Sequence, residues 1–187
     1  MTAYFKLQLA DYVEYHRDPR NCAMHVLGII LLFLAALLPL TEWSISVFGA
    51  QVSLAAILVL PVLIYWLVLD ASLGLAIFGA AILLLVTAAI IVDHASVVSV
   101  WITSAVLIGI GVASQIIGHR VFERRQPALV DDPAHLLLGP MFLMTKLFIV
   151  LGFRQDLAAI IGPGVQHRPT DTSHYPADRR GEPHARS

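Results

Sequence analysis

Charged residues are scarce in this sequence. Asp, Glu, Lys and Arg make up only 13% of its 187 residues, whereas 58% are hydrophobic and the mean hydropathy is +0.77. A soluble domain carries about 25% charged residues, so charge this sparse cannot cover a surface that faces water. The sequence therefore predicts a membrane protein, and its length allows one domain.

Cysteine pairs and several familiar catalytic motifs are also missing. The single cysteine, Cys22, excludes an internal disulfide. A net charge of −1, without a basic stripe that carries interleaved aromatic residues, argues against nucleic-acid binding. HExxH, GxSxG, a Gly-rich phosphate loop and the HxxHH boxes of membrane di-iron hydroxylases do not occur in the chain. The sequence thus gives no support to the reactions that depend on those motifs.

Long apolar runs dominate what is present. A helix needs about 20 apolar residues to cross a bilayer, and four runs qualify: 22–40, 52–69, 71–92 and 95–117. A fifth run, 135–153, is interrupted by Gly139-Pro140 and by Lys146. We therefore expect an all-α membrane protein with four transmembrane helices and a C-terminal re-entrant or interfacial helix.

This multi-span domain is expected to occupy residues 1–160. Residues 162–187 are rich in Pro, His, Arg and Asp and have too few apolar side chains to bury, so they are expected to form a disordered polar tail. Small residues in the spans, Gly74, Gly109 and Gly111, should permit close helix packing. Aromatic residues near span ends, Tyr12, Tyr15 and Trp43, are expected to form an interfacial belt.

Lysine and arginine are missing from the connections between the predicted spans. They stand instead before the first span, after the fourth span and after the last apolar run. By the positive-inside rule, both termini are then cytoplasmic if 135–153 does not cross the membrane, and the ammonium of Lys146 would reach the headgroups. We expect a multi-pass protein in the lipid bilayer, with a bacterial plasma membrane favoured over an endoplasmic reticulum.

In this topology, histidines gather on the cytoplasmic side. His16 and His25 lie at the start of the first span, His119 at the end of the fourth and His135 at the start of the last run. Because three separate segments carry these imidazoles, they can converge on one face, whereas His94 lies on the opposite face. Four imidazoles suit iron or zinc, so the pattern indicates a candidate metal site.

Glu123 stands four residues after His119, a spacing that places two side chains on one face of an α-helix. Two histidines and one carboxylate leave positions open for oxygen and substrate on Fe(II). Other interpretations stay open. His16, Asn21 and His119 can instead form a structural polar cluster in a non-enzymatic membrane protein, and a bis-histidine haem protein is also compatible. A transporter is disfavoured, because no ionisable residue falls deep inside the predicted spans.

The stretch YHRDPRNCAMHVLG, residues 15–28, resembles the opening motif of the Mpo-like family. That motif reads Tyr-His, two residues, Pro, one residue, Asn, three residues, His, two residues and Gly. A second motif, Gln-x-Ile-Gly-His-x-x-Phe-Glu followed by Pro-Ala-Leu, is matched within residues 115–129, and residues 139–142 are similar to the family's ending. The resemblance covers about residues 4–160.

The resemblance implies an Fe(II)-dependent dioxygenase that shortens 2-hydroxy fatty acids by one carbon at the membrane interface. Its partners would be a 2-hydroxy fatty acid and dioxygen. By the same resemblance His16, His25 and His119 would hold the iron. For His135, the role of a fourth ligand and that of a donor to the substrate carboxylate both stay open.

Three further residues are expected to be catalytic: Glu123, Arg120 and Asn21. Arginine suits bidentate recognition of a carboxylate, so Arg17, Arg20 or Arg120 is expected to pair with the substrate headgroup. The acyl tail would lie between the spans or in the lipid. A reactive fatty-acid head resides at the interface, which explains why histidines stand where the first span begins.

Overall fold

The structure is a computed structural model that describes residues 1–124 and 135–161. Its elements in chain order are α1 (Ala3–Glu14), α2 (Pro19–Thr41), β1 (Ser44–Val47), β2 (Ala50–Ser53), α3 (Leu54–Leu69), α4 (Ala71–His94), α5 (Val97–Ile117), the π-helix η1 (Gly118–Glu123), α7 (His135–Val150) and α8 (Gln155–Ile161). The predicted polar tail, 162–187, and the side chain of His135 lie outside the described residues.

Side-chain caps set where the long helices begin. At the start of α2 the Arg20 N–H donates to Asp18 Oδ1 at 2.7 Å, and Pro19 occupies the first helical position, which has no need of an N–H. Asp70 caps α4 in the same way, through the N–H groups of Ser72 and Leu73. Short polar segments between apolar runs therefore become helix boundaries.

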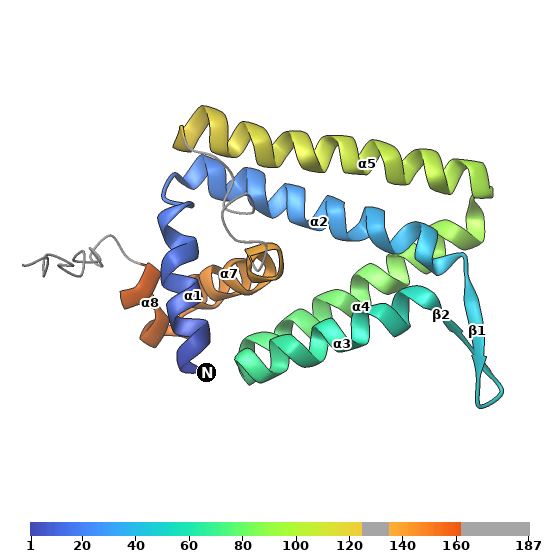
Figure 1. Cartoon of the computed structure of the whole chain (residues 1–187), viewed down its shortest axis with the longest axis horizontal. Coiled ribbons are helices and arrows are strands. Elements are labelled where there is room, and N and C mark those ends of the chain that lie inside the picture. Colours follow the sequence, from blue (N-terminus) through green and yellow to red (C-terminus); the bar gives the residue numbers. More distant parts are fainter. Residues whose placement is uncertain (125–134, 162–187) are drawn as a thin grey trace, which may run out of the picture.

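Helices α2 and α5 lie side by side over most of their length (Figure 1). A Cβ added to Gly28 would lie 2.8 Å from Gln115 Nε2 and 3.0 Å from the Gly111 carbonyl oxygen, so only glycine permits this approach. Close packing was predicted at Gly111 and Gly74 and is confirmed at both. An added Cβ would lie 2.7 Å from Leu32 Cγ at Gly111 and 2.7 Å from the Leu67 backbone at Gly74. The prediction was wrong for Gly109, which faces open space.

Three helices in the described residues are long and apolar enough to cross a membrane: Pro19–Thr41, Ala71–His94 and Val97–Glu123. The predicted span 52–69 is instead a 16-residue helix, α3, preceded by a strand. At 1.5 Å per residue, α3 is about 24 Å long, shorter than a bilayer core of about 30 Å. Four full spans are thus not confirmed, and the re-entrant or interfacial placement of α7 stays a prediction.

A β-hairpin, β1–β2, replaces the plain connection expected between the first two spans. It is antiparallel, with Ser44 opposite Ser53, and projects from the end of the molecule where α2 finishes (Figure 1). Its turn residues Phe48 and Gly49 have φ of 49° and 83°, the left-handed conformation that two-residue hairpin loops use. The all-α prediction therefore holds for most of the chain but not here.

Helices α1, α7 and α8 gather at the opposite end, near the start of α2 (Figure 1). Their apolar faces join those of α3 and α4 in one core, to which Phe5, Leu9, Tyr12, Trp66, Met141 and Leu157 belong. The Trp66 indole N–H donates to the Leu137 carbonyl at 2.7 Å and ties α3 to α7. Tyr12 is only 4% exposed, so its predicted place in an aromatic belt was wrong. This packing places α7 against both α1 and α2.

Candidate metal centre

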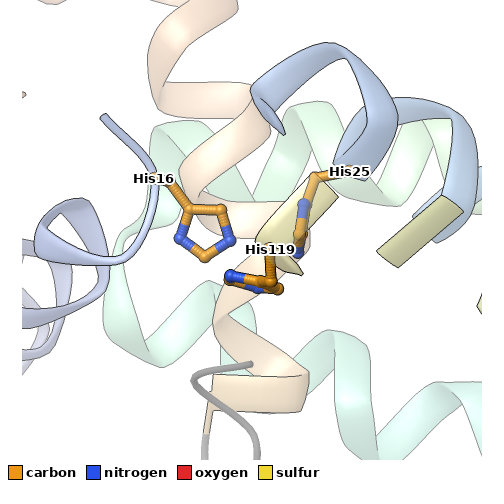
Figure 2. A group of neighbouring side chains, drawn as sticks. All are labelled: His16, His25 and His119. Carbon is orange, nitrogen blue, oxygen red and sulfur yellow. The ribbon is translucent and has the colours of Figure 1, made fainter. Parts of the chain in front are cut away.

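Three imidazoles converge where α1, α2 and η1 meet, as Figure 2 shows. His16 lies in the turn between α1 and α2, His25 in the second turn of α2 and His119 in η1. One nitrogen from each ring lies within 4.8 Å of the others, and the residues are 2%, 6% and 2% exposed. We call these three residues the histidine triad. The predicted convergence is confirmed for them.

Backbone hydrogen bonds orient two of the rings. His16 Nδ1–H donates to the Tyr12 carbonyl at 2.9 Å, and His25 Nδ1–H donates to the Asn21 carbonyl at 3.2 Å. A carbonyl oxygen can only accept, so Nδ1 carries the hydrogen in both rings and Nε2 keeps a free lone pair. This is the tautomer in which Nε2 can bind a metal ion.

Two nitrogens of the triad are buried without a hydrogen-bond partner among the described residues: His16 Nε2 and His119 Nδ1. A buried polar atom left unpaired costs about 1–3 kcal/mol. Burial, together with the neighbouring ionisable groups His25, His119 and Lys146, lowers the pKa of His16 to about 2. The ring is therefore neutral, as a metal ligand must be. The triad fits a transition-metal ion such as iron or zinc.

Glu123 does not join the triad. Its Oε1 accepts from the Asp18 N–H at 2.7 Å and from Asn21 Nδ2 at 3.2 Å, so it tethers η1 to the start of α2. The predicted face shared with His119 assumed an α-helix, but residues 118–123 form a π-helix, a feature frequent at functional sites. A role for Glu123 as ligand or catalyst stays a prediction.

Asn21 connects the same segments beneath the triad. Besides Glu123, its Nδ2 donates to the Tyr15 carbonyl at 3.1 Å, while its own backbone carbonyl orients His25. The side chain is fully buried, and a Cβ added to Gly118 would lie 2.3 Å from its Oδ1. The contacts describe a residue that positions η1 and His25.

Aromatic side chains that sequence reasoning did not assign to the site enclose it. The Tyr12 ring stacks on His16 at a centroid distance of 4.1 Å and an interplanar angle of 7°. The Phe142 ring lies 5.4 Å from His16 and 5.0 Å from Tyr12. The i,i+4 spacing of Tyr12 and His16 could have indicated the first contact, but nothing local points to Phe142, 126 residues further along.

The arginines expected to meet a substrate carboxylate all lie exposed. Arg17 pairs with Glu14, Arg20 lies over the Phe122 ring at 5.8 Å, and Arg120 is exposed on η1. Their role toward substrate stays a prediction. His94 is 75% exposed at the end of α4, away from the triad, as its predicted place on the opposite face requires (Figure 1).

Fold and site together define a helical membrane protein with a buried three-histidine candidate metal centre. A family model described as "2-hydroxy-palmitic acid dioxygenase Mpo1-like" matches residues 2–151. The 2-hydroxy-palmitic acid dioxygenase MPO1 of Saccharomyces cerevisiae is 32% identical over 155 residues, which cover 82% of this chain and 85% of that protein. The chain therefore belongs to the Mpo1-like family, and the resemblance seen in the sequence is confirmed. No solved structure matches the chain significantly.

Proposed function

We propose that this chain is an Fe(II)-dependent dioxygenase that shortens 2-hydroxy fatty acids by one carbon. The observation that carries the proposal is the histidine triad, with two buried nitrogens that lack a partner among the described residues. The name of the yeast relative supports the substrate class. In the alternative, a structural His/Asn cluster, the polar atoms should all be paired. Asn21 Nδ2 is paired, but His16 Nε2, His119 Nδ1 and Asn21 Oδ1 have no partner among the described residues, which favours a metal centre.

The proposed reaction needs no oxidant besides dioxygen. The C1–C2 bond of the 2-hydroxy acid breaks, C2 becomes the carboxyl carbon of the shortened acid, and C1 leaves as carbon dioxide. This change removes four electrons from carbon, which one dioxygen accepts on reduction to the level of water. Bound iron supplies Lewis acidity and redox chemistry toward dioxygen.

The chain's own residues hold and shield the reacting groups in this proposal. His16, His25 and His119 provide the nitrogens, and the carbonyls of Tyr12 and Asn21 keep two rings in the binding tautomer. The stacked Tyr12 ring and Phe142 close one side of the triad against water. Exclusion of water prevents loss of reactive species to side reactions.

The membrane would hold the acyl chain. Exposed leucine, isoleucine and valine side chains cover α3, α4 and α5, for example Val68, Leu83 and Val98, each at least 67% exposed. Such a surface suits lipid rather than water. We propose that α2, α4 and α5 cross the bilayer and that α3 leads the chain back through it to the cytoplasmic side. The end of the molecule with the triad, which carries Arg17, Arg20 and Arg120, then faces the cytoplasm.

Iron content tests this proposal directly. Protein purified anaerobically in detergent should contain about one iron per chain, lost in His16→Ala and in His119→Ala but kept in the matched control His94→Ala, because that imidazole is exposed far from the triad. Oxygen uptake with 2-hydroxypalmitate should follow the iron. Folded wild-type protein that takes up no iron, even after anaerobic Fe(II) reconstitution, would rule out the dioxygenase.

A further inference from the structure

Lys146 is a cation on an otherwise apolar helix, α7, and it stands beside the histidine triad. Its Nζ lies 2.8 Å from Cys22 Sγ and 4.8 Å from the centroid of the Phe142 ring. The Cys22 thiol in turn donates to the His16 carbonyl at 3.3 Å, and the Phe142 ring lies 5.4 Å from the His16 ring. Only the side chains of Cys22 and Phe142 therefore lie between this ammonium and His16, a candidate metal ligand.

The position of Lys146 is held by the packing of α7. The neighbouring Thr145 and Met141 are fully buried. At Gly139 an added Cβ would lie 2.8 Å from Ile29 Cδ1 and 3.3 Å from the Tyr12 hydroxyl oxygen, so α7 sits tightly on α1 and α2. The packing fixes where α7 lies, and the contacts of Nζ with Cys22 and Phe142 place the ammonium beside the triad.

Within the described residues, the half-buried ammonium of Lys146 has no carboxylate within ion-pair distance. Its contacts there are a thiol, which is a weak acceptor, and the face of an aromatic ring. Partial burial has therefore removed water from the ammonium without supplying an anion. Such a cation is suited to bind an anionic ligand that enters the site.

We propose that Lys146 binds the carboxylate of the fatty acid substrate and thereby holds its C1 end beside His16. This assignment rests on the proposed function, which supplies an acid with its head at the triad. The ammonium is a compact point charge with three donors, so it can hold one carboxylate oxygen and leave the other oxygen and the 2-hydroxyl directed to the triad. Arg17, Arg20 and Arg120, which the sequence suggested for this role, are exposed to the surroundings rather than held beside the triad.

Equilibrium binding to metal-free protein tests this assignment without turnover. The ligands are radiolabelled 2-hydroxypalmitate, palmitate and the neutral 1,2-hexadecanediol, in an uncharged detergent. A charge-assisted hydrogen bond contributes about 1.5–3 kcal/mol, so Lys146→Met should raise the Kd of both acids by about tenfold or more and leave that of the diol unchanged. Lys146→Arg should retain binding of the acids.

Lys6→Met is the matched control, because Lys6 is the only other lysine and is exposed on α1. It should bind all three ligands as wild type does. Should Lys146→Met fail to fold, Lys146→Gln against Lys146→Arg makes the same comparison. A folded variant without the charge that binds palmitate as wild type does would overturn the assignment and place the ammonium among lipid headgroups.

The two proposals can fail separately in these assays. Binding of acids that depends on Lys146, in a wild-type protein that takes up no iron, would leave the carboxylate site standing and remove the dioxygenase. If the protein takes up iron and consumes oxygen, but binds the acids equally well without Lys146, the dioxygenase proposal stands and the proposed role of Lys146 is wrong.

Discussion

Two of the buried polar clusters among the described residues, one around Asp70 and one formed by the histidine triad, differ in how completely they are hydrogen-bonded. Asp70, which is 3% exposed, accepts from the N–H groups of Ser72 and Leu73 and from the Ser72 hydroxyl. Arg154 Nη1 lies 3.0 Å from both carboxylate oxygens, and the amino terminus lies 3.6 Å from one of them. These contacts join α1, α4 and the turn before α8.

The histidine triad is less completely hydrogen-bonded than the Asp70 cluster. Its rings are as deeply buried as Asp70, yet two of its nitrogens have no partner among the described residues. A paired cluster repays the desolvation of its groups inside the fold, whereas unpaired buried atoms cost free energy until a ligand binds. The first cluster therefore stabilises the fold, and the unpaired nitrogens of the second support the proposal that it binds a ligand.

Loss of the paired cluster should give the largest effect on stability. Asp70→Asn leaves Arg154 paired only with the exposed Asp156. The loss of charge-assisted hydrogen bonds should lower the free energy of unfolding by about 3 kcal/mol, measured by denaturant unfolding in detergent. Asp93→Asn is the control, because Asp93 is 83% exposed, and should change it by less than about 0.5 kcal/mol. Iron bound per folded chain should stay constant in both, and its loss in Asp70→Asn would erase the contrast between the clusters.

A smaller loss of stability is expected from Gly118→Ala, which places a methyl group against Asn21 beneath the triad. The new Cβ would lie 2.3 Å from Asn21 Oδ1, and overpacking of this kind costs about 1–3 kcal/mol. Iron affinity should fall as well, since Asn21 orients His25. Gly109→Ala, in open space on α5, should instead stabilise by up to about 1 kcal/mol. Equal effects of the two alanines would show that the contact with Asn21 carries no energy.

Acid should weaken the paired cluster selectively. Burial by itself would raise the pKa of Asp70, but hydrogen bonds from Leu73, Ser72 and Arg154 outweigh it and lower that pKa. A lowered folded pKa gives stability that is complete above the ordinary aspartate value of about 4 and is lost as the pH falls through the lowered value. The difference in stability between wild type and Asp70→Asn should therefore begin to shrink as the pH falls below about 4, as followed by Trp fluorescence during unfolding. A gap that does not narrow as the pH falls below about 4 would contradict this.

The smallest effect is expected from Glu123→Gln. Glutamine keeps an oxygen that can accept from the Asp18 N–H and Asn21 Nδ2, so iron content and fold should both change little. Glu123→Ala removes the tether and should cost about 1–2 kcal/mol from two lost hydrogen bonds. Loss of iron in the glutamine variant would show instead that the carboxylate is a metal ligand.

Much of the site followed from local patterns, and the rest did not. The placement of the triad at one end came from charge bias and the order of the spans, and the family came from two short motifs. The α-helical spacing predicted that Glu123 and His119 share one face. Residues 118–123 instead form a π-helix, and the Glu123 carboxylate accepts a hydrogen bond from the Asp18 N–H. Tyr12 was predicted to lie at the membrane interface. Its burial could not be foreseen, because its partner Phe142 lies far away in the chain. The hairpin was missed because β1 lies outside the apolar runs and β2 overlaps the start of one of them.

The sequence by itself determined the membrane class, the three longest helices, the family and the three histidines. These follow from composition, from apolar run length and from residue spacing, which are properties of the chain before it folds. Tertiary structure alone decided which nitrogens stay unpaired, which cation stands beside them and which carboxylate is used for the fold. Those outcomes depend on contacts between segments up to 153 residues apart, such as Arg154 with Met1, and no local pattern encodes such distances.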